Sequence, residues 1–207
     1  ITDGRDTYAR SGVKFVNDFM EKAKKLNLGV IGTISGRYYT MDRDNRWERI
    51  KKAYNAMVYE SGNVFPNADV CFKEHYKRDI TDEFINPSII NQGCTIKEKD
   101  AVLFINFRPE RMKEIIDALT DPNFKMFKTK HFEKTKFVSI FNIHKNIPYA
   151  FNTEKPKDTL GEYLDELEFT QARIAETEKY AHVTHFFDGD RDLNSNRIEK
   201  FLVPSPN

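Results

Sequence analysis

The apolar positions of this chain alternate between helical spacing and short continuous runs. Helical spacing predicts four helices, over residues 7–26, 45–61, 108–121 and 159–168. Continuous apolar runs at 100–107 and 136–144 predict strands that are buried on both faces. Shorter apolar runs at 27–35 and 182–187 predict two further strands, while 172–181 fits either pattern. Because strands alternate with helices, we expect an α/β fold with a mainly parallel sheet flanked by helices.

The end of the chain differs from the rest. Residues 188–207 are largely polar and finish with a Pro-Ser-Pro sequence before the last residue. Such a composition favours a connecting segment over a packed element. We therefore expect one folded domain over residues 1–187, followed by a hinge or linker over residues 188–207.

Composition and charge narrow the function classes. The 207 residues are 39% hydrophobic, and 33 Lys and Arg balance 32 Asp and Glu. A net charge of +1 argues against a general nucleic-acid binder, so an anion site here must be local. No run reaches the ~18 apolar residues that a membrane span needs. Cys71 and Cys94 lack metal-type spacing and are expected to be reduced thiols, which favours the cytoplasm.

Arginine is concentrated in a segment that follows a predicted strand. The sequence GRYYTMDRDNRWER, residues 36–49, holds four arginines against three acids. Arg46 and Arg49 fit the polar face of the following helix. Arg37 and Arg43 lie outside any good helical spacing, so a solvated helix face does not account for them.

A second segment places arginines at the start of a helix. In FRPER, Arg108 leaves a predicted strand and Pro109 suits the first position of the helix. Arg111 then lies in the first turn, beside free backbone N–H groups and the positive end of the helix dipole. Arginine can also bind phosphate or carboxylate through two parallel hydrogen bonds, so this segment predicts an anion site.

A third segment, DGRD at residues 3–6, adds another arginine and the carboxylate of Asp6. Open α/β sheets bind ligands at the carboxyl ends of their strands, where these segments are expected to lie. Five guanidinium groups with one nearby carboxylate predict a small, highly anionic ligand that bears a hydroxyl. The five are Arg5, Arg37, Arg43, Arg108 and Arg111.

Each of these signals has an ordinary structural explanation when taken alone. DGRD is a common turn sequence. Two arginines three residues apart in a first helical turn usually form a solvated face. The joint occurrence of the three segments favours an anion pocket, but it does not define a reaction.

Four segments of the chain carry a resemblance to a known family. In order, DGRDT, GRYYTMDRDNRWERIKKAY, FINFRPERM and RIAETEKYAHVTHFFDG resemble the cofactor-independent (2,3-bisphosphoglycerate-independent) phosphoglycerate mutases. The resemblance runs over nearly the whole chain. It implies an isomerase of glycolysis and gluconeogenesis that interconverts 3-phosphoglycerate and 2-phosphoglycerate by phosphotransfer.

The resemblance covers one of the family's two domains. The family joins a phosphatase-like domain, with a serine nucleophile and two divalent metal ions, to an inserted phosphotransferase domain. The metals are manganese, or alternatively magnesium or cobalt. This chain resembles the inserted domain alone, and no residue here matches the serine or a metal ligand. We therefore expect an excised domain without a cofactor, inactive by itself, whose partner is its own phosphatase-like domain in a monomeric enzyme.

The resemblance also implies roles for residues at one end of the substrate. Arg5 and Asp6 match a pair in which the arginine binds the anionic end and the aspartate contacts the sugar-acid hydroxyls as a proton acceptor. General-base help to a hydroxyl requires a carboxylate within hydrogen-bond reach. Arg37 and Arg43 match arginines that grip the phosphoglycerate.

Three further residues match the group that handles the phosphoryl transfer. Arg108 and Arg111 match the pair that holds the phosphoryl group, where stabilising negative charge is the main contribution a protein can make. Lys179 matches a lysine that reaches toward the transferring phosphate, although alone it would be taken for a surface lysine. His185 and Asp190 replace residues that are usually Phe and Gly in the family, which affects the expected hinge rather than the substrate site.

A second function class stays open beside half of a mutase active site. A standalone module that binds phosphorylated small molecules, or a regulatory module, could retain the same anion pocket. The expected truncation at both ends favours the mutase domain.

Overall fold

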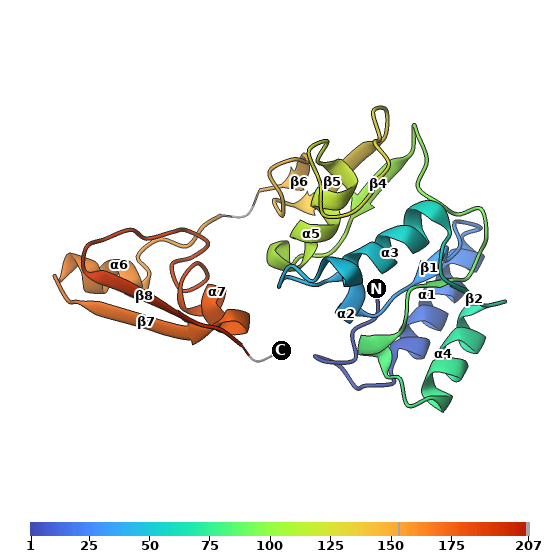
Figure 1. Cartoon of the computed structure of the whole chain (residues 1–207), viewed down its shortest axis with the longest axis horizontal. Coiled ribbons are helices and arrows are strands. Elements are labelled where there is room, and N and C mark those ends of the chain that lie inside the picture. The colour runs from blue at the N-terminus through green and yellow to red at the C-terminus, as the bar shows by residue number, and fades with distance from the viewer. Residues whose placement is uncertain (153, 206–207) are drawn as a thin grey trace. The chain divides into compact units, whose positions relative to one another are not determined.

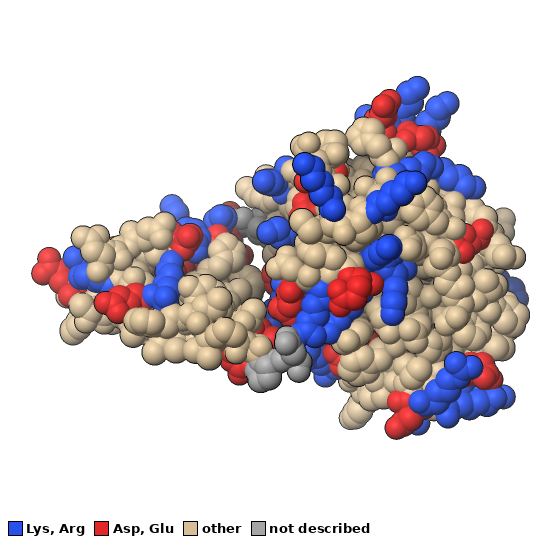
Figure 2. Space-filling view, in the orientation of Figure 1, with Lys and Arg blue, Asp and Glu red and all other residues tan. Residues whose placement is uncertain are grey.

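The computed structural model describes residues 1–152 and 154–205 (Figure 1). The chain divides into two compact units, Ile1–Phe151 and Asn152–Asn207. The predicted division between residues 187 and 188 therefore falls inside the second unit. No helix in the described part of the chain is long and apolar enough to cross a membrane. On the face drawn in Figure 2, acidic and basic side chains are interspersed on each unit.

The first unit contains most of the helices and strands. Its helices are α1 (Gly12–Lys25), α2 (Arg37–Thr40), α3 (Trp47–Tyr59), α4 (Ala68–Lys77), the short 3-10 helix η1 (Asp82–Phe84) and α5 (Pro109–Thr120). Its strands are β1 (Thr33–Ile34), β2 (Asn63–Val64), β3 (Ser88–Ile89), β4 (Ala101–Phe104), β5 (Lys136–Phe141) and β6 (Tyr149–Phe151). The four helices predicted from the apolar spacing all form, three of them in this unit.

Parallel pairing predominates among the strands. β4, β5 and β6 form a sheet in that order with both pairings parallel. In the small sheet β1-β3-β2, β2 pairs with β3 in parallel and β1 pairs with it antiparallel. The α/β class with mainly parallel strands flanked by helices is confirmed.

The main core of the first unit lies between α3, α5 and the β4–β6 sheet. Ile50 and Tyr54 of α3 and Ile115 and Ile116 of α5 are completely or almost completely buried. Ile50 and Tyr54 are four residues apart, and Ile115 and Ile116 follow the buried Met112 by three and four residues, which is the amphipathic spacing from which both helices were predicted. This packing fixes the position of α5, and it therefore fixes the backbone positions from which the side chains of the first turn extend.

The prediction that residues 100–107 are buried on both faces is wrong. Phe104 packs into the core, but Leu103 is 53% and Ile105 is 68% exposed. Apolar residues on both sides of a strand give the same sequence signal whether one face or two are covered. The carboxyl end of β4 is therefore open on one face.

The second unit decides the form of the segment that the sequence left open, and it contains a strand where a linker was expected. It contains α6 (Leu160–Glu166), β7 (Gln171–Glu176), the 3-10 helix η2 (Thr177–Lys179), α7 (Tyr180–Val183) and β8 (Ile198–Val203). The segment 172–181 is thus a strand followed by helical turns. β8 pairs with β7 in parallel over six residues, so part of the predicted linker is a strand.

The strand predicted at residues 182–187 is also wrong. α7 and the turns after it form backbone and hydroxyl hydrogen bonds within the segment. The Thr184 hydroxyl and its backbone N–H both donate to the Tyr180 carbonyl, at 2.7 and 3.2 Å. The Asp188 N–H donates to the Thr184 carbonyl, and the Asp188 carboxylate forms a buried ion pair with Arg173 at 2.6 Å. These local hydrogen bonds outweigh the β-propensity of the apolar residues.

Candidate functional site

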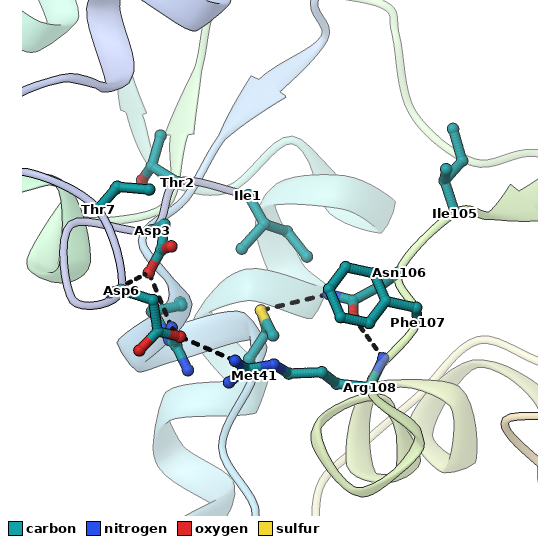
Figure 3. Close-up of a pocket in the computed structure, with 11 residues that line it drawn as sticks. Ile1, Thr2, Asp3, Asp6, Thr7, Met41, Ile105, Asn106, Phe107 and Arg108 are labelled. Atoms are coloured by element: carbon teal, nitrogen blue, oxygen red, sulfur yellow. Dashed lines mark hydrogen bonds and ion pairs between the residues drawn. The ribbon is translucent and has the colours of Figure 1, made fainter.

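A pocket of about 360 Å³ opens at the carboxyl end of β4 in the first unit (Figure 3). It is formed by the loop before α1, by the start of α2 and by the segment that connects β4 to α5. Its lining residues are Ile1, Thr2, Asp3, Asp6, Thr7, Arg37, Met41, Ile105, Asn106, Phe107 and Arg108. Three of the residues predicted from the sequence, Asp6, Arg37 and Arg108, are therefore brought together.

Asp6 is the carboxylate that connects two arginines of the pocket. Its Oδ2 atom accepts from Arg37 Nη1 at 2.7 Å and from Arg108 Nη2 at 2.9 Å. The hydrogen bond from Arg37, with the charges of both guanidinium groups, holds the Asp6 pKa below its usual value despite some desolvation. Figure 3 shows the Arg108 side chain reaching from the start of α5 toward Asp6. Asp6 is therefore ionised at neutral pH.

Asp3 shapes the same loop and was not predicted as a site residue. Its Oδ1 atom accepts from the backbone N–H groups of Arg5 and Asp6, each at 3.2 Å, and from Arg37 Nη1 at 2.8 Å. An aspartate that binds backbone N–H groups two and three residues later is typical of an Asx turn. The signal was present in DGRD, but a turn aspartate does not show in sequence that it also holds an arginine.

Arg37 is held rigidly in the wall of the pocket. Its side chain is only 6% exposed, and burial would lower its pKa, but the hydrogen bonds that it donates to Asp6 and Asp3 outweigh burial and raise the pKa. Gly36 before it pairs with Thr2 in a parallel bridge, and a Cβ on Gly36 would lie 2.2 Å from the Glu83 carbonyl oxygen. Only glycine fits this approach, so the tight packing at Gly36 fixes the start of α2.

The first turn of α5 carries Arg111 beside the pocket. Its Nη1 atom donates to the Met41 carbonyl at 3.1 Å, whereas its Nε atom is buried with no hydrogen-bond partner in the described residues. Burial lowers the Arg111 pKa, and the charges of Arg43, Arg37 and Arg5 lower it further. A partly buried cation among like charges is costly unless an anion binds to it. This is the clearest mark of an anion site in the structure.

The other predicted site residues are less directly placed. Arg43 lies in the segment between α2 and α3, and Arg5 lies on the pocket loop with its Nη1 atom 3.7 Å from Glu83 Oε1. Their charges act on Arg111, which places both near that group. Lys179 lies at the end of η2 in the second unit, and its approach to the substrate stays a prediction.

The described residues form no site for the divalent metal ions that the resemblance implies for the whole enzyme. In the described ranges 1–152 and 154–205, no three His, Cys, Asp or Glu side chains are grouped so that they could hold a metal ion. The carboxylates of the pocket are paired with arginines, whose charge opposes a nearby cation. The two divalent ions implied by the resemblance are therefore not assigned to residues of this chain.

The chain is similar to known proteins over nearly its whole length. A family model described as the N-terminus of BPG-independent phosphoglycerate mutase matches residues 1–145. The 2,3-bisphosphoglycerate-independent phosphoglycerate mutase of Clostridium kluyveri is 44% identical, over 100% of this chain and 42% of the relative. The corresponding protein of Francisella philomiragia is 41% identical, over 99% of this chain and 41% of the relative.

A solved structure shows the same fold. A Leishmania mexicana phosphoglycerate mutase, crystallised at low cobalt concentration, superimposes with a TM-score of 0.87 at 26% sequence identity. The match covers 99% of this chain and 41% of that one, so the chain spans about two fifths of the length of the relatives it matches. The matched family model spans 145 of the 207 residues, including the arginines of the pocket. The chain belongs to the family of 2,3-bisphosphoglycerate-independent phosphoglycerate mutases.

Proposed function

We propose that this chain is the substrate-binding phosphotransferase domain of an enzyme that interconverts 3-phosphoglycerate and 2-phosphoglycerate. The observation that carries the proposal is the arginine group at the pocket, above all Arg111, whose Nε atom is buried and has no hydrogen-bond partner among the described residues. Phosphoglycerate carries a phosphate, a carboxylate and a hydroxyl. These are the groups that several guanidiniums and one carboxylate can bind together.

Binding of the ligand would rearrange the ion pairs around Asp6. Arg108 is 37% exposed and holds Asp6 by one hydrogen bond, so an incoming phosphate or carboxylate can take Arg108 at little cost. Arg37 is buried and also bonded to Asp3, so it stays in place. Arg108 is therefore the arginine that changes partners when the ligand binds, whereas Arg37 keeps its position in the pocket wall.

The same exchange prepares Asp6 for its proposed chemistry. While two guanidiniums bind it, Asp6 is a weak base because its pKa is depressed. A carboxylate accepts a proton most effectively when its pKa lies near the working pH. Transfer of Arg108 to the ligand raises the Asp6 pKa and leaves one acceptor position of Oδ2, which still binds Arg37, open to the substrate hydroxyl. Asp6 then accepts the hydroxyl proton as that oxygen attacks the phosphoryl group carried by the serine of the phosphatase-like domain, so that a P–O bond to the substrate forms while the P–O bond to the serine breaks.

Arg108 and Arg111 are proposed to stabilise the negative charge of the phosphoryl group as it changes oxygen atoms. Guanidinium groups oriented before the reaction lower the barrier without reorganisation during it. The serine that receives the phosphoryl group and the two divalent metal ions are proposed to belong to the phosphatase-like domain. Lys179, from the second unit, is proposed to complete the phosphate contacts.

Calorimetric titration of the 207-residue chain tests the binding half of this proposal. 3-Phosphoglycerate should bind, and Arg111→Ala should raise its Kd by about 10-fold or more, because a charge-assisted hydrogen bond contributes about 1.5–3 kcal/mol. Arg10→Ala is the matched control, since Arg10 is an exposed arginine of the same unit that pairs with Asp79. Equal Kd values for the two variants, or binding of glycerate as tight as that of 3-phosphoglycerate, would exclude the proposed phosphate site.

A turnover assay tests the division of labour between domains. The purified chain alone should not interconvert 3-phosphoglycerate and 2-phosphoglycerate, because the nucleophile and metals are proposed to lie elsewhere. Addition of a phosphatase-like domain from a relative should restore some turnover if the two halves associate. Interconversion by the chain alone, free of host enzyme, would contradict the proposal.

A further inference from the structure

Two acidic side chains, Asp42 and Glu114, are buried at the segment that carries Arg43. Asp42 precedes Arg43 and is 4% exposed, and Glu114 of α5 is also 4% exposed. Glu114 lies one turn beyond Arg111, at the same spacing of three residues that separates Arg111 from Arg108. One side of α5 therefore presents two pocket arginines and then a buried acid.

The two acids have different partners. Asp42 Oδ2 accepts from the backbone N–H groups of Asp44 and Arg46, at 3.0 and 2.9 Å, and Oδ1 pairs with Arg49 at 3.1 Å. Asp42 therefore takes the place of a capping residue at the start of α3, where Arg46 provides no side-chain cap.

Glu114 is held by only one of its oxygens. Its Oε1 atom accepts from the Asn45 backbone N–H at 2.9 Å. Its Oε2 atom is buried and has no hydrogen-bond partner in the part of the chain that the structure describes. A charged carboxylate in this setting would be desolvated, half satisfied and next to a second carboxylate.

We propose that Glu114 is a positioning residue which, as a neutral acid, holds the Asp42–Arg46 segment and so orients Arg43 toward the bound anion. Asn45, which it holds, has a left-handed backbone with φ of 60°, and its N–H is the one between the Asp44 and Arg46 N–H groups that Asp42 binds, so the two acids hold the segment together. The part of the inference that concerns Arg43 rests on the proposed function. The hold on Asn45 does not.

The charges around Glu114 explain why the neutral form is favoured. Burial raises its pKa to about 7, against the hydrogen bond from Asn45, and the carboxylates of Asp42 and Asp44 add to the rise. The cation on the α3 side, Arg49, is already paired with Asp42. On α5 itself the charged residues within four positions of Glu114 are Glu110, Arg111, Lys113 and Asp117, of which Arg111 donates to the Met41 carbonyl and Asp117 pairs with His144. Above pH about 7, Glu114 becomes an anion beside Asp42, and repulsion loosens the segment.

Amide signals of the ligand-free chain test the hold directly. The Asn45 backbone amide should shift with an apparent pKa of about 7 in the wild type. In Glu114→Gln, which keeps the acceptor and replaces the acid proton by an amide donor, this transition should be absent. Glu48→Gln makes the same chemical change at an exposed carboxylate of α3 and should leave the transition in place. An Asn45 amide without a transition in the wild type, or with the same transition in Glu114→Gln, would overturn the proposal.

Binding of 3-phosphoglycerate then tests the effect on Arg43. The ratio of the wild-type Kd to the Glu114→Gln Kd cancels the titration of the ligand itself. This ratio should be near one at about pH 6 and rise about 5-fold or more by about pH 8.5. Glu114→Ala, which removes the acceptor for Asn45, should bind weakly at both values. A constant ratio with an intact Asn45 transition would overturn the role toward Arg43, while absence of binding in every variant would instead contradict the proposed function.

Discussion

Two acidic side chains beside the same group of arginines are in opposite states. Asp6 is half exposed, shares one oxygen between Arg37 and Arg108, and has a depressed pKa. Glu114 is buried, binds a single backbone N–H, and has a pKa raised to about 7. The number of cations that each carboxyl group contacts, together with burial, accounts for the difference.

The comparison shows how one acid can take part in the reaction while the other maintains the shape of the site. Asp6 is ionised and lies where a ligand can exchange with its partners, so it can change state during binding. Glu114 faces the packed interior, where a neutral acid can hold Asn45 without placing a second charge beside Asp42. Replacing each acid by its amide should therefore have different consequences for kcat.

The largest effect should come from Asp6→Asn in an enzyme that joins this chain to a phosphatase-like domain. We expect kcat to fall by about 10²- to 10⁴-fold, the usual contribution of a general base. The Kd for 3-phosphoglycerate should change little, since the amide keeps the shape and releases the two arginines. Steady-state kinetics and calorimetry measure both quantities. Glu114→Gln at about pH 7 should keep near-normal kcat, and the same loss in both amide variants would break the comparison.

The next largest effect separates the arginines that surround the phosphoryl group from those that hold the ligand. Arg111→Ala should lower kcat by about 100-fold, as when one oxyanion donor is lost. Arg43→Ala should mainly raise KM, because an interaction present equally in ground and transition states changes binding alone. Steady-state kinetics of the two variants provide the test. Identical kinetic signatures would show that the group acts as one unit.

The two acids should also stabilise the fold in different pH windows. Asp6, with a depressed pKa, contributes stability that is present above its usual pKa of 3.8 and lost as the pH falls through its lower folded pKa. Glu114, with a raised pKa, contributes most below its usual value of 4.5, and this contribution falls as the pH rises toward about 7. In thermal melts, the Tm of the wild type should fall relative to the Tm of Glu114→Gln as the pH rises from about 4.5 to about 7. Parallel curves would contradict the neutral Glu114.

The smallest effect is expected from a change that keeps the charge. Arg43→Lys should weaken 3-phosphoglycerate binding less than Arg43→Ala does, by roughly a few-fold, because an ammonium retains the charge but not the paired geometry of a guanidinium. Calorimetry of the two variants and the wild type measures the difference. A lysine variant as weak as the alanine variant would show that geometry alone decides binding at this position.

The sequence predicted the helices well because their burial is one-sided. α3 and α5 alternate core residues such as Ile50 and Ile115 with polar ones, and that period appears directly in the sequence. Burial of β4 on one face only could not be predicted, because apolar side chains do not reveal which face of a strand is covered. The helical form of residues 180–183 could not be predicted either, because it depends on local hydrogen bonds such as the one from Thr184 to the Tyr180 carbonyl. The β8 strand was missed since its partner, β7, is distant in sequence.

The candidate site shows the same limit. Arginines after strands were visible in the sequence, and the structure brings Arg37 and Arg108 onto one carboxylate. Asp3 and Glu114 were missed because their roles depend on contacts across 34 and 69 residues of chain, with Arg37 and Asn45. A turn aspartate and a helical glutamate are too common for sequence alone to single them out.

The most direct test of the account is an NMR titration of the arginine Nε–Hε signals with 3-phosphoglycerate. The account predicts that the signals of Arg37, Arg43, Arg108 and Arg111 shift together and saturate at one ligand concentration. The Arg111 signal should move most, since residues 1–152 and 154–205 provide no hydrogen-bond partner for its Nε atom. Shifts confined to other arginines, such as Arg10 or Arg78, or no shifts at saturating ligand, would contradict the arginine pocket as the phosphoglycerate site.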